Sequence, residues 1–201
     1  MRSKKIGLLG GSFNPAHDGH LYISETALKV LGLDEVWWLI SPQNPLKSAD
    51  DTQLFENRMI QAKALCSNPA IRISDFERTH GQTYTSDTLS KLKEIYPDCQ
   101  FVWLMGADNL AQIPKWHKWA NIFETVPIAV FDRPGYTFKA LGGKAARTYA
   151  NHRVFPASPG RPILDFATRS TPAWTFVTHT KHKLSSTYIR KCVNNAGSAC
   201  S

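Results

Sequence analysis

The chain has 201 residues, of which 42% are hydrophobic and 20% are charged, as in soluble proteins that bury one substantial core. It lacks an uninterrupted apolar run of the roughly 18 to 20 residues that a membrane span requires. The opening stretch, MRSKKIGLLGG, also lacks the apolar region of a signal peptide. We therefore expect a single domain over residues 1–201 that is cytoplasmic and does not associate with a membrane.

The chain is basic, with 24 Lys and Arg residues against 16 Asp and Glu residues, a formal charge of +8. Such an excess favours an anionic partner or simply good solubility. The basic residues are spread along the chain rather than clustered, which argues against a nucleic-acid-binding protein. The four cysteines form no CxxC pair, so we expect free thiols rather than a disulfide framework or a zinc site.

Several short, continuous apolar runs predict strands that are buried on both faces. These runs lie at residues 6–10, 35–41, 101–106, 127–132 and 174–179.

Segments between these runs show the apolar spacing of helices. They lie at 21–32, where Gly32 follows the last periodic residue, at 52–66, and at 85–97, where Pro97 stops the pattern. The alternation of buried strands with helices predicts an α/β protein with a Rossmann-like, doubly wound parallel sheet. Residues 151–173 contain four prolines and are predicted to form a long loop, either a lid or a surface excursion.

The stretch GGSFNPAHDGH, from Gly10 to His20, directly follows the first predicted strand. In parallel sheets ligands bind at the carboxyl ends of the strands. Gly10 and Gly11 allow a tight turn that brings backbone N–H groups close to a ligand. The stretch is neither a Walker A loop nor a GxGxxG fingerprint.

The helix behind this stretch is predicted to begin near Gly19, with Asp18 as its N-cap. His17 and His20 are three residues apart, so in a helical turn they project to one side and present two imidazoles to an anion at the helix N-terminus. The alternatives are two surface histidines on a loop, or a zinc pair, for which no third ligand is nearby.

Near the other end, LSSTYIRKCV at 184–193 predicts a short helix capped by serine or threonine. Ser186 and Arg190 lie one turn apart on it. A hydroxyl and a guanidinium on one helix face form a phosphate clamp; the alternative is a capped surface helix.

Both segments resemble motifs of one nucleotidyltransferase superfamily, which includes the nicotinate mononucleotide adenylyltransferases. The first is similar to its GxFxPxHxGH signature and matches at Gly11, Phe13, Pro15, His17, Gly19 and His20. The second is similar to ISSTxIR, with Leu184 in place of the first isoleucine and matches at Ser185, Ser186, Thr187, Ile189 and Arg190.

Four segments between these ends resemble bacterial nicotinate mononucleotide adenylyltransferases in particular. They are SPQNPLK at 41–47, TYTSDTL at 83–89, GADNLAQIPKWHKW at 106–119 and RPG at 133–135. The resemblance covers most of residues 6–136 and then 184–193.

The resemblance implies a site residue by residue. It assigns ATP binding to Gly10, Gly11, Ser12, Phe13, His17, His20, Gly106, Asp108, Ser186, Thr187 and Arg190. It assigns mononucleotide binding to Lys47, Tyr84, Thr85, Trp116 and Arg133, and catalysis to His17, His20, Lys47 and Arg190.

Within this set, the resemblance implies that Asp108 contacts a nucleotide ribose and that Trp116, with the backbone at Tyr84 and Thr85, holds the pyridine ring. Each role has an alternative. Trp116 and Trp119 could instead be core aromatics, an alternative that fits Trp119 better than Trp116.

Two further residues have structural alternatives to a functional role. Asp87 fits a helix cap better than a ligand. Arg58 fits a solvated helix position as well as a functional one.

The implied reaction is transfer of AMP from ATP to nicotinate mononucleotide, with pyrophosphate released and Mg²⁺ bridging the triphosphate. Because the sequence has no dedicated carboxylate pair for the metal, we expect the phosphates to supply most of its ligands. Rival interpretations are the nicotinamide mononucleotide as acceptor, a pantetheine-phosphate adenylyltransferase or cytidylyltransferase, and a nucleotide sensor without turnover. The motifs do not indicate the oligomeric state.

Overall fold

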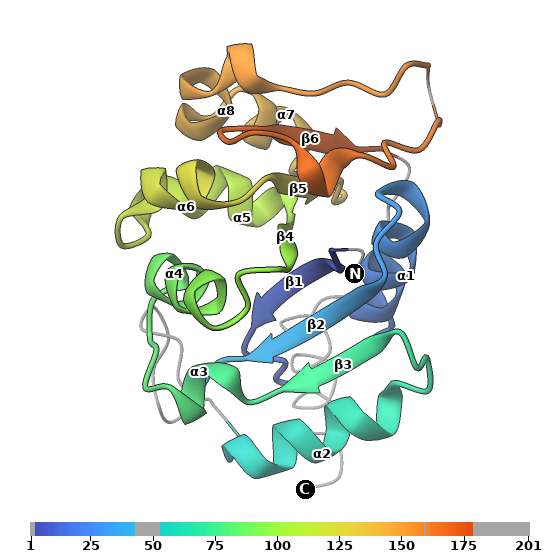
Figure 1. Cartoon of the computed structure of the whole chain (residues 1–201), viewed down its shortest axis with the longest axis vertical. Coiled ribbons are helices and arrows are strands. Elements are labelled where there is room, and N and C mark those ends of the chain that lie inside the picture. The colour runs from blue at the N-terminus through green and yellow to red at the C-terminus, as the bar shows by residue number, and fades with distance from the viewer. Residues whose placement is uncertain (1–2, 43–52, 159, 179–201) are drawn as a thin grey trace, which may run out of the picture.

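A computed structural model describes residues 3–42, 53–158 and 160–178. Its centre is a six-stranded, all-parallel sheet in the order β3-β2-β1-β4-β5-β6 (Figure 1). The strands are β1 (Lys5–Gly11), β2 (Glu35–Ile40), β3 (Ile71–Ser74), β4 (Gln100–Gly106), β5 (Ile128–Phe131) and β6 (Trp174–Val177). This confirms the predicted α/β, Rossmann-like parallel sheet.

Helices follow the strands in the order expected of a doubly wound sheet. They are α1 (Asp18–Val30), α2 (Phe55–Leu65), α3 (Phe76–Thr79), α4 (Thr85–Ile95), α5 (Ala107–Gln112), α6 (Trp119–Thr125), α7 (Thr137–Leu141) and α8 (Lys144–Thr148). Three 3₁₀ turns join them: η1 (Ile113–Lys115), η2 (Ala150–His152) and η3 (Phe166–Thr168). Figure 1 shows α4, α5 and α6 on one side of the sheet and α1 on the other.

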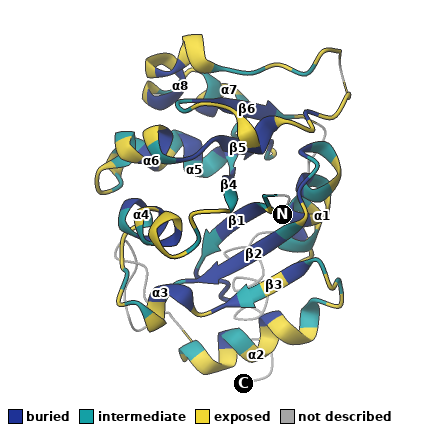
Figure 2. Ribbon diagram, in the orientation of Figure 1, coloured by how far each residue is buried: buried dark blue, intermediate teal, exposed yellow. Residues whose placement is uncertain are grey.

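Neighbouring residues of a strand enter opposite cores, which explains the continuous apolar runs in the sequence. In β2, Trp37 and Leu39 belong to the cluster beneath α4 to α8, whereas Trp38 and Ile40 belong to the cluster beneath α1 and α2. The inner strands are accordingly buried along most of their length, whereas the edge strand β3 is exposed at Arg72, and the outward faces of the helices are exposed (Figure 2).

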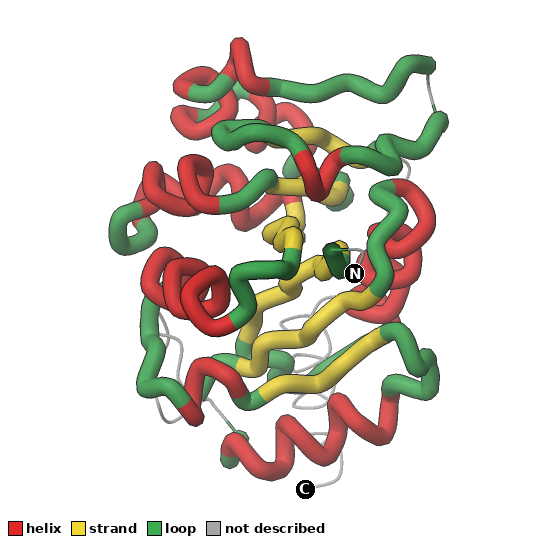
Figure 3. Tube along the Cα trace, in the orientation of Figure 1, coloured by secondary structure: helices red, strands yellow, loops and turns green. Residues whose placement is uncertain are grey.

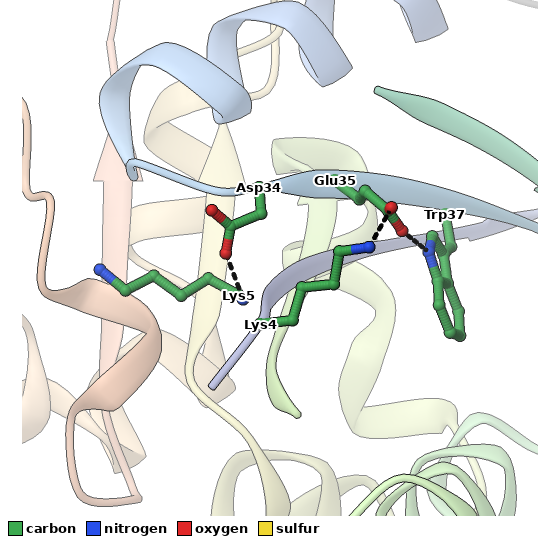
Figure 4. Close-up of polar contacts among 5 residues, drawn as sticks. All are labelled: Lys4, Lys5, Asp34, Glu35 and Trp37. Carbon is green, nitrogen blue, oxygen red and sulfur yellow. Dashed lines mark hydrogen bonds and ion pairs between the residues drawn. The ribbon is translucent and has the colours of Figure 1, made fainter. Parts of the chain in front are cut away.

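Polar contacts join the amino ends of β1 and β2, at the edge of the sheet where β1 begins (Figure 4). The Lys5 backbone N–H donates to Asp34 Oδ2 at 2.8 Å. Glu35 accepts from Lys4 Nζ through one oxygen and from Trp37 Nε1, at 2.8 Å, through the other. These contacts anchor the start of β1, so its carboxyl end is the end free to carry a functional loop.

The proline-rich segment predicted as a loop is largely irregular and crosses one face of the molecule between α8 and β6 (Figure 3). It is not a lid over Gly10–His20. Ile163 donates from its backbone N–H to Val30 O at 2.6 Å, and Leu164 O accepts from Lys5 Nζ at 2.8 Å. Phe166 is fully buried in the cluster beneath α1. Because Lys5 begins β1 and Val30 ends α1, the segment completes the core at the opposite edge of the sheet.

Gly10 and Gly11, the last two residues of β1, differ in the space around them. A Cβ added to Gly10 would lie 2.3 Å from the Trp103 ring, whereas one added to Gly11 would lie 3.6 Å from the Phe13 ring, an ordinary contact. Trp103 is 2% exposed, so its indole has no space into which to move. Gly10 is therefore required by packing, and Gly11 is not.

We expect Gly10→Ala to lower the free energy of unfolding by about 1 to 3 kcal/mol, the usual cost of overpacking a core. Gly11→Ala should change it by less than about 1 kcal/mol, because its new methyl group meets no obstacle. Urea unfolding of both variants and the parent checks this. Equal losses in the two variants would contradict the packing account of Gly10.

Glu77 is a carboxyl buried between α3 and α4, at 5% exposure. The Thr88 hydroxyl donates to its Oε1 at 3.0 Å and also lies 3.1 Å from Tyr84 O. The Gln82 backbone N–H donates to Glu77 O at 2.7 Å. Burial raises the pKa of Glu77 to about 7, so the folded chain holds it largely protonated below neutral pH.

Because the pKa of Glu77 is higher in the folded chain than its ordinary value of 4.5, ionisation of this carboxyl costs the folded state stability. That cost begins as the pH rises above the unfolded pKa and reaches its full size above the folded pKa. We therefore expect Glu77→Gln to stabilise the protein at about pH 8, by on the order of 1 to 3 kcal/mol, and to have little effect below the unfolded pKa.

Thermal unfolding of Glu77→Gln across this pH range tests the expectation. Glu94→Gln is the matched control, because Glu94 is exposed and pairs with Lys91 on the surface of α4. A Glu77→Gln effect that is independent of pH would contradict the account.

Candidate active site

The carboxyl ends of β1 and β4 form the place where the winding of the sheet reverses. The two strands are neighbours, but α1, which follows β1, packs on one face through Ala27 and Leu31. The helix that follows β4, α5, packs on the other face through Ala107 and Leu110. Such a switch in strand order leaves a crevice outside the strand ends in which ligands bind. The Gly10–His20 stretch and Gly106 both leave the sheet here, as predicted.

His17, rather than the predicted Asp18, caps α1. His17 is extended, at φ −153° and ψ 166°, and its Nδ1 accepts from the Gly19 backbone N–H at 3.1 Å. His20 Nδ1 accepts in return from the His17 backbone N–H, also at 3.1 Å. Asp18 becomes the first residue of the helix, where its carboxylate favours the positive end of the helix dipole. The prediction followed the usual preference for aspartate at an N-cap and was one residue late.

The reciprocal cap determines the chemistry of the two imidazoles. Because each Nδ1 accepts a hydrogen bond, each neutral ring carries its proton on Nε2 and offers it as a donor. The ring centroids are 3.8 Å apart. Burial, the neighbouring His17 and the charge of Arg133 lower the pKa of His20 well below its ordinary 6.5. At neutral pH His20 is therefore an uncharged Nε2–H donor.

An aromatic and hydroxyl network supports His20 from beneath. The Phe13 ring is 1% exposed and lies 4.6 Å from the His20 ring and 5.0 Å from Trp38, on which it stacks. Trp38 Nε1 donates to Ser24 Oγ at 2.7 Å, and Ser24 Oγ donates to His20 O at 2.8 Å. Phe13, assigned above to the ATP site, thus has its ring in the core. It takes the left-handed conformation, with φ 45°, a strained backbone that the packing of the ring maintains.

Asp108 and Arg133, assigned above to two different substrates, form an ion pair with one another. A Cβ on Gly106 would lie 2.5 Å from Asp108 Oδ1, so this glycine makes room for the folded-back carboxylate. The Arg133 backbone N–H donates to Asp132 Oδ1 at 2.8 Å, and Thr137 Oγ1 donates to the same oxygen. The ends of β4 and β5 are thereby linked beside His20.

The residues assigned to the pyridine ring lie at the start of α4 and after η1. Tyr84 is the N-cap residue of α4, with its side chain 42% exposed. Its ring lies 4.4 Å from that of His117, at 31°, which brings the segments of Thr85 and Trp116 together. Trp116 is half-buried and packs against the core. Sequence analysis did not single out His117, which lies within the PKWHKW part of the motif at 106–119.

The structure decides the alternative raised for Trp119 and rules out the cap suggested for Asp87. Trp119 packs edge-on against Phe123 and Tyr149, each at 6.0 Å, and is a core aromatic. Asp87 is not a helix cap: it is the third residue of α4 and accepts from Ser86 Oγ at 3.2 Å.

The sequence left two interpretations of Arg58, a solvated position and a functional one. The solvated interpretation is wrong, because the residue is 1% exposed.

Most of the described candidates lie at the carboxyl ends of the strands and in the loops that follow them. Four others, Lys47, Ser186, Thr187 and Arg190, lie outside the described residues, as does the predicted helix at 184–193.

In the part of the chain that the structure describes, no three His, Cys, Asp or Glu side chains gather as a protein-built metal centre requires. No helix in the described ranges has the length and apolar character to cross a bilayer.

Comparison with known proteins places the chain in a family. A family model described as cytidylyltransferase-like matches residues 8–192. A probable nicotinate-nucleotide adenylyltransferase of Methylorubrum extorquens is 46% identical over 92% of this chain and 98% of its own length. One of Parvibaculum lavamentivorans is 54% identical over 71% of each chain.

A solved structure from Plasmodium falciparum shares the fold. It is a nicotinic acid mononucleotide adenylyltransferase complexed with NaAD, and it aligns with a TM-score of 0.67 at 20% identity over 94% of this chain and 83% of its own. The chain belongs to the cytidylyltransferase-like family and, within it, to the group of relatives named nicotinate-nucleotide adenylyltransferases.

Proposed function

We propose that this protein transfers AMP from ATP to nicotinate mononucleotide, forming deamido-NAD and pyrophosphate in NAD biosynthesis. The observation that carries the proposal is the pair of imidazoles at the start of α1, at the switch in strand order, whose Nδ1 atoms accept backbone hydrogen bonds and so leave each Nε2–H as the donor. Its relatives of 43% to 54% identity that are named for this activity support the same conclusion.

The reaction needs no general base. An oxygen of the mononucleotide phosphate attacks the α-phosphorus of ATP, and the bond from that phosphorus to the oxygen bridging to the β-phosphorus breaks, releasing pyrophosphate. Because a phosphate monoester is already anionic at neutral pH, catalysis consists of aligning two anions and stabilising the charge that develops. An imidazole whose pKa is held low suits this task, because it donates Nε2–H without having to gain a proton.

Several parts of the chain supply positive potential to the phosphates. The first turn of α1, which has 13 residues, offers the positive end of its helix dipole. His17 and His20 donate to phosphate oxygens. In the proposal Lys47, Ser186, Thr187 and Arg190 contribute the remaining donors. Arg133 is available to a phosphate or carboxylate once a ligand exchanges its bond to Asp108.

We further propose that Mg²⁺ accompanies ATP as a complex with the triphosphate. The donor set fits a metal that arrives with its phosphate ligands, because no three metal-ligating side chains gather in the described ranges. When bound, the ion neutralises phosphate charge.

Pyrophosphate release by the purified protein, with ATP and Mg²⁺, tests the assignment. Nicotinate mononucleotide, nicotinamide mononucleotide and 4′-phosphopantetheine serve as parallel acceptors. We expect release with the nicotinate compound, weaker release with the amide and none with phosphopantetheine. Equal or greater release with another acceptor would reassign the substrate, and ATP binding without any release would leave a nucleotide sensor.

We expect His20→Ala to keep the fold and to lose roughly 100-fold or more in kcat, the scale of removing one transition-state donor. His152→Ala is the control, since His152 is exposed on η2 and distant in the chain from this site. Steady-state kinetics and circular dichroism check both. A folded His20→Ala enzyme with near-normal kcat would contradict the donor role.

A further inference from the structure

Arg58 is the most buried cationic side chain among the described residues, and α2 delivers it beneath the site. It is 1% exposed, whereas arginine is rarely buried without a partner. Its guanidinium donates to four backbone carbonyls: Nη1 to Ser12 O at 2.5 Å and Ser41 O at 2.8 Å, Nη2 to Pro42 O at 2.9 Å, and Nε to Gln53 O at 3.1 Å.

Three of these carbonyls belong to segments that leave neighbouring strands, and the fourth, that of Gln53, lies just before α2. Ser12 follows β1 and opens the loop that leads to the two histidines, whereas Ser41 and Pro42 follow β2 and open SPQNPLK. The two loops also share a direct bond, from the Ser41 backbone N–H to Gly11 O at 2.9 Å. A single rigid side chain thus cross-links the two loops where they leave the sheet.

The contacts are those of a clamp for main-chain oxygens rather than of an ion pair. No carboxylate in the described part of the chain pairs with Arg58; the nearby Glu56 pairs with Arg78 instead. The planar fork of guanidinium N–H donors matches carbonyls arranged around it, and a lysine ammonium on a flexible stem does not span the same set.

We propose that Arg58 is a positioning residue for the reaction: it fixes the loop that carries His17 and His20 relative to Ser41 and Pro42 at the end of β2, and so holds the two imidazoles in place for the phosphates. The reaction half of this statement rests on the proposed function. The loop half stands on the hydrogen bonds alone. Arg58 touches neither substrate, and it acts through the backbone that carries the groups that do.

Arg58→Lys and Arg58→Gln test the proposal, with the two variants guarding against a failure of either one to fold. Arg78→Lys is the matched control: Arg78 lies over the same Phe55 ring, at 4.8 Å against 5.3 Å for Arg58, but is half exposed and bonds to Glu56. Ala62→Gly, on the next turn of α2, controls for loss of stability, because it weakens the helix by about 1 kcal/mol and leaves the clamp intact.

Two readouts separate the halves of the proposal. Hydrogen–deuterium exchange without substrate should show faster exchange confined to the peptides that cover residues 11–20 and those that cover Ser41 and Pro42 in the Arg58 variants. Kinetics should show kcat reduced roughly 10- to 100-fold, as misplacement by about an ångström costs, while the Kd for ATP changes only a few-fold.

The outcomes are distinct. Exchange and kcat unchanged from those of Arg78→Lys would overturn the proposal. So would losses that match those of Ala62→Gly at equal stability, because Arg58 would then be merely structural. If the parent enzyme shows no adenylyl transfer, the proposed function fails, and the exchange data still decide whether Arg58 locks the loops.

Discussion

The architecture depends on β1 being enclosed, since it pairs with β2 on one edge and β4 on the other and is covered by a core on each face. Hydrogen bonds from Lys4 and Lys5 to Glu35 and Asp34 hold the amino end of β1 against the start of β2. The loop that carries the site residues follows its carboxyl end. The residue at the exit, Gly10, is packed so closely on Trp103 that no side chain fits. The chain therefore leaves through a short loop and re-enters a helix whose first turn lies at the sheet edge, and the site is assembled around that exit.

The loop then imposes a chemical state on the residues that it carries. Reciprocal hydrogen bonds between the backbone and the two Nδ1 atoms fix both tautomers, and the Phe13 and Trp38 rings pack against the half-buried His20 ring. The same contacts that begin the helix make the imidazoles uncharged donors. Local structure and reactivity are consequences of one arrangement, and a reaction that needs charge stabilisation but no proton abstraction matches it.

Sequence patterns predicted the elements that depend on local composition. The strands at β1, β2 and β4 were evident because burial on both faces demands continuous apolar runs. Strand β3 was missed, because its four residues, Ile71–Ser74, form no continuous apolar run. The short helices α5 to α8 were missed for a similar reason, since they are held by tertiary packing rather than by a long periodic stripe.

Within the site, the motif residues that the structure describes make contacts that depend on partners distant in the chain. Arg58 has the spacing of an ordinary helix residue, and its burial follows from carbonyls up to 46 positions away. The pairing of Asp108 with Arg133 likewise spans 25 positions. No local pattern reports such contacts. The cap was predicted at Asp18 instead of His17 because intrinsic preferences rank aspartate above histidine. Here the hydrogen bond that His20 Nδ1 accepts from the His17 backbone N–H reverses that ranking.

The seam between the proline-rich segment and the start of the chain has a consequence for biosynthesis. Leu164 accepts from Lys5 across 159 positions, and Phe166 fills the core against β4 and α1. A chain emerging from the ribosome completes β1 and α1 early, yet the part of the core beside β4 that Phe166 fills stays open until this late segment has been synthesised. The core around the first strand to be made is thus completed only near the end of synthesis, and until then the nascent chain exposes apolar surface there.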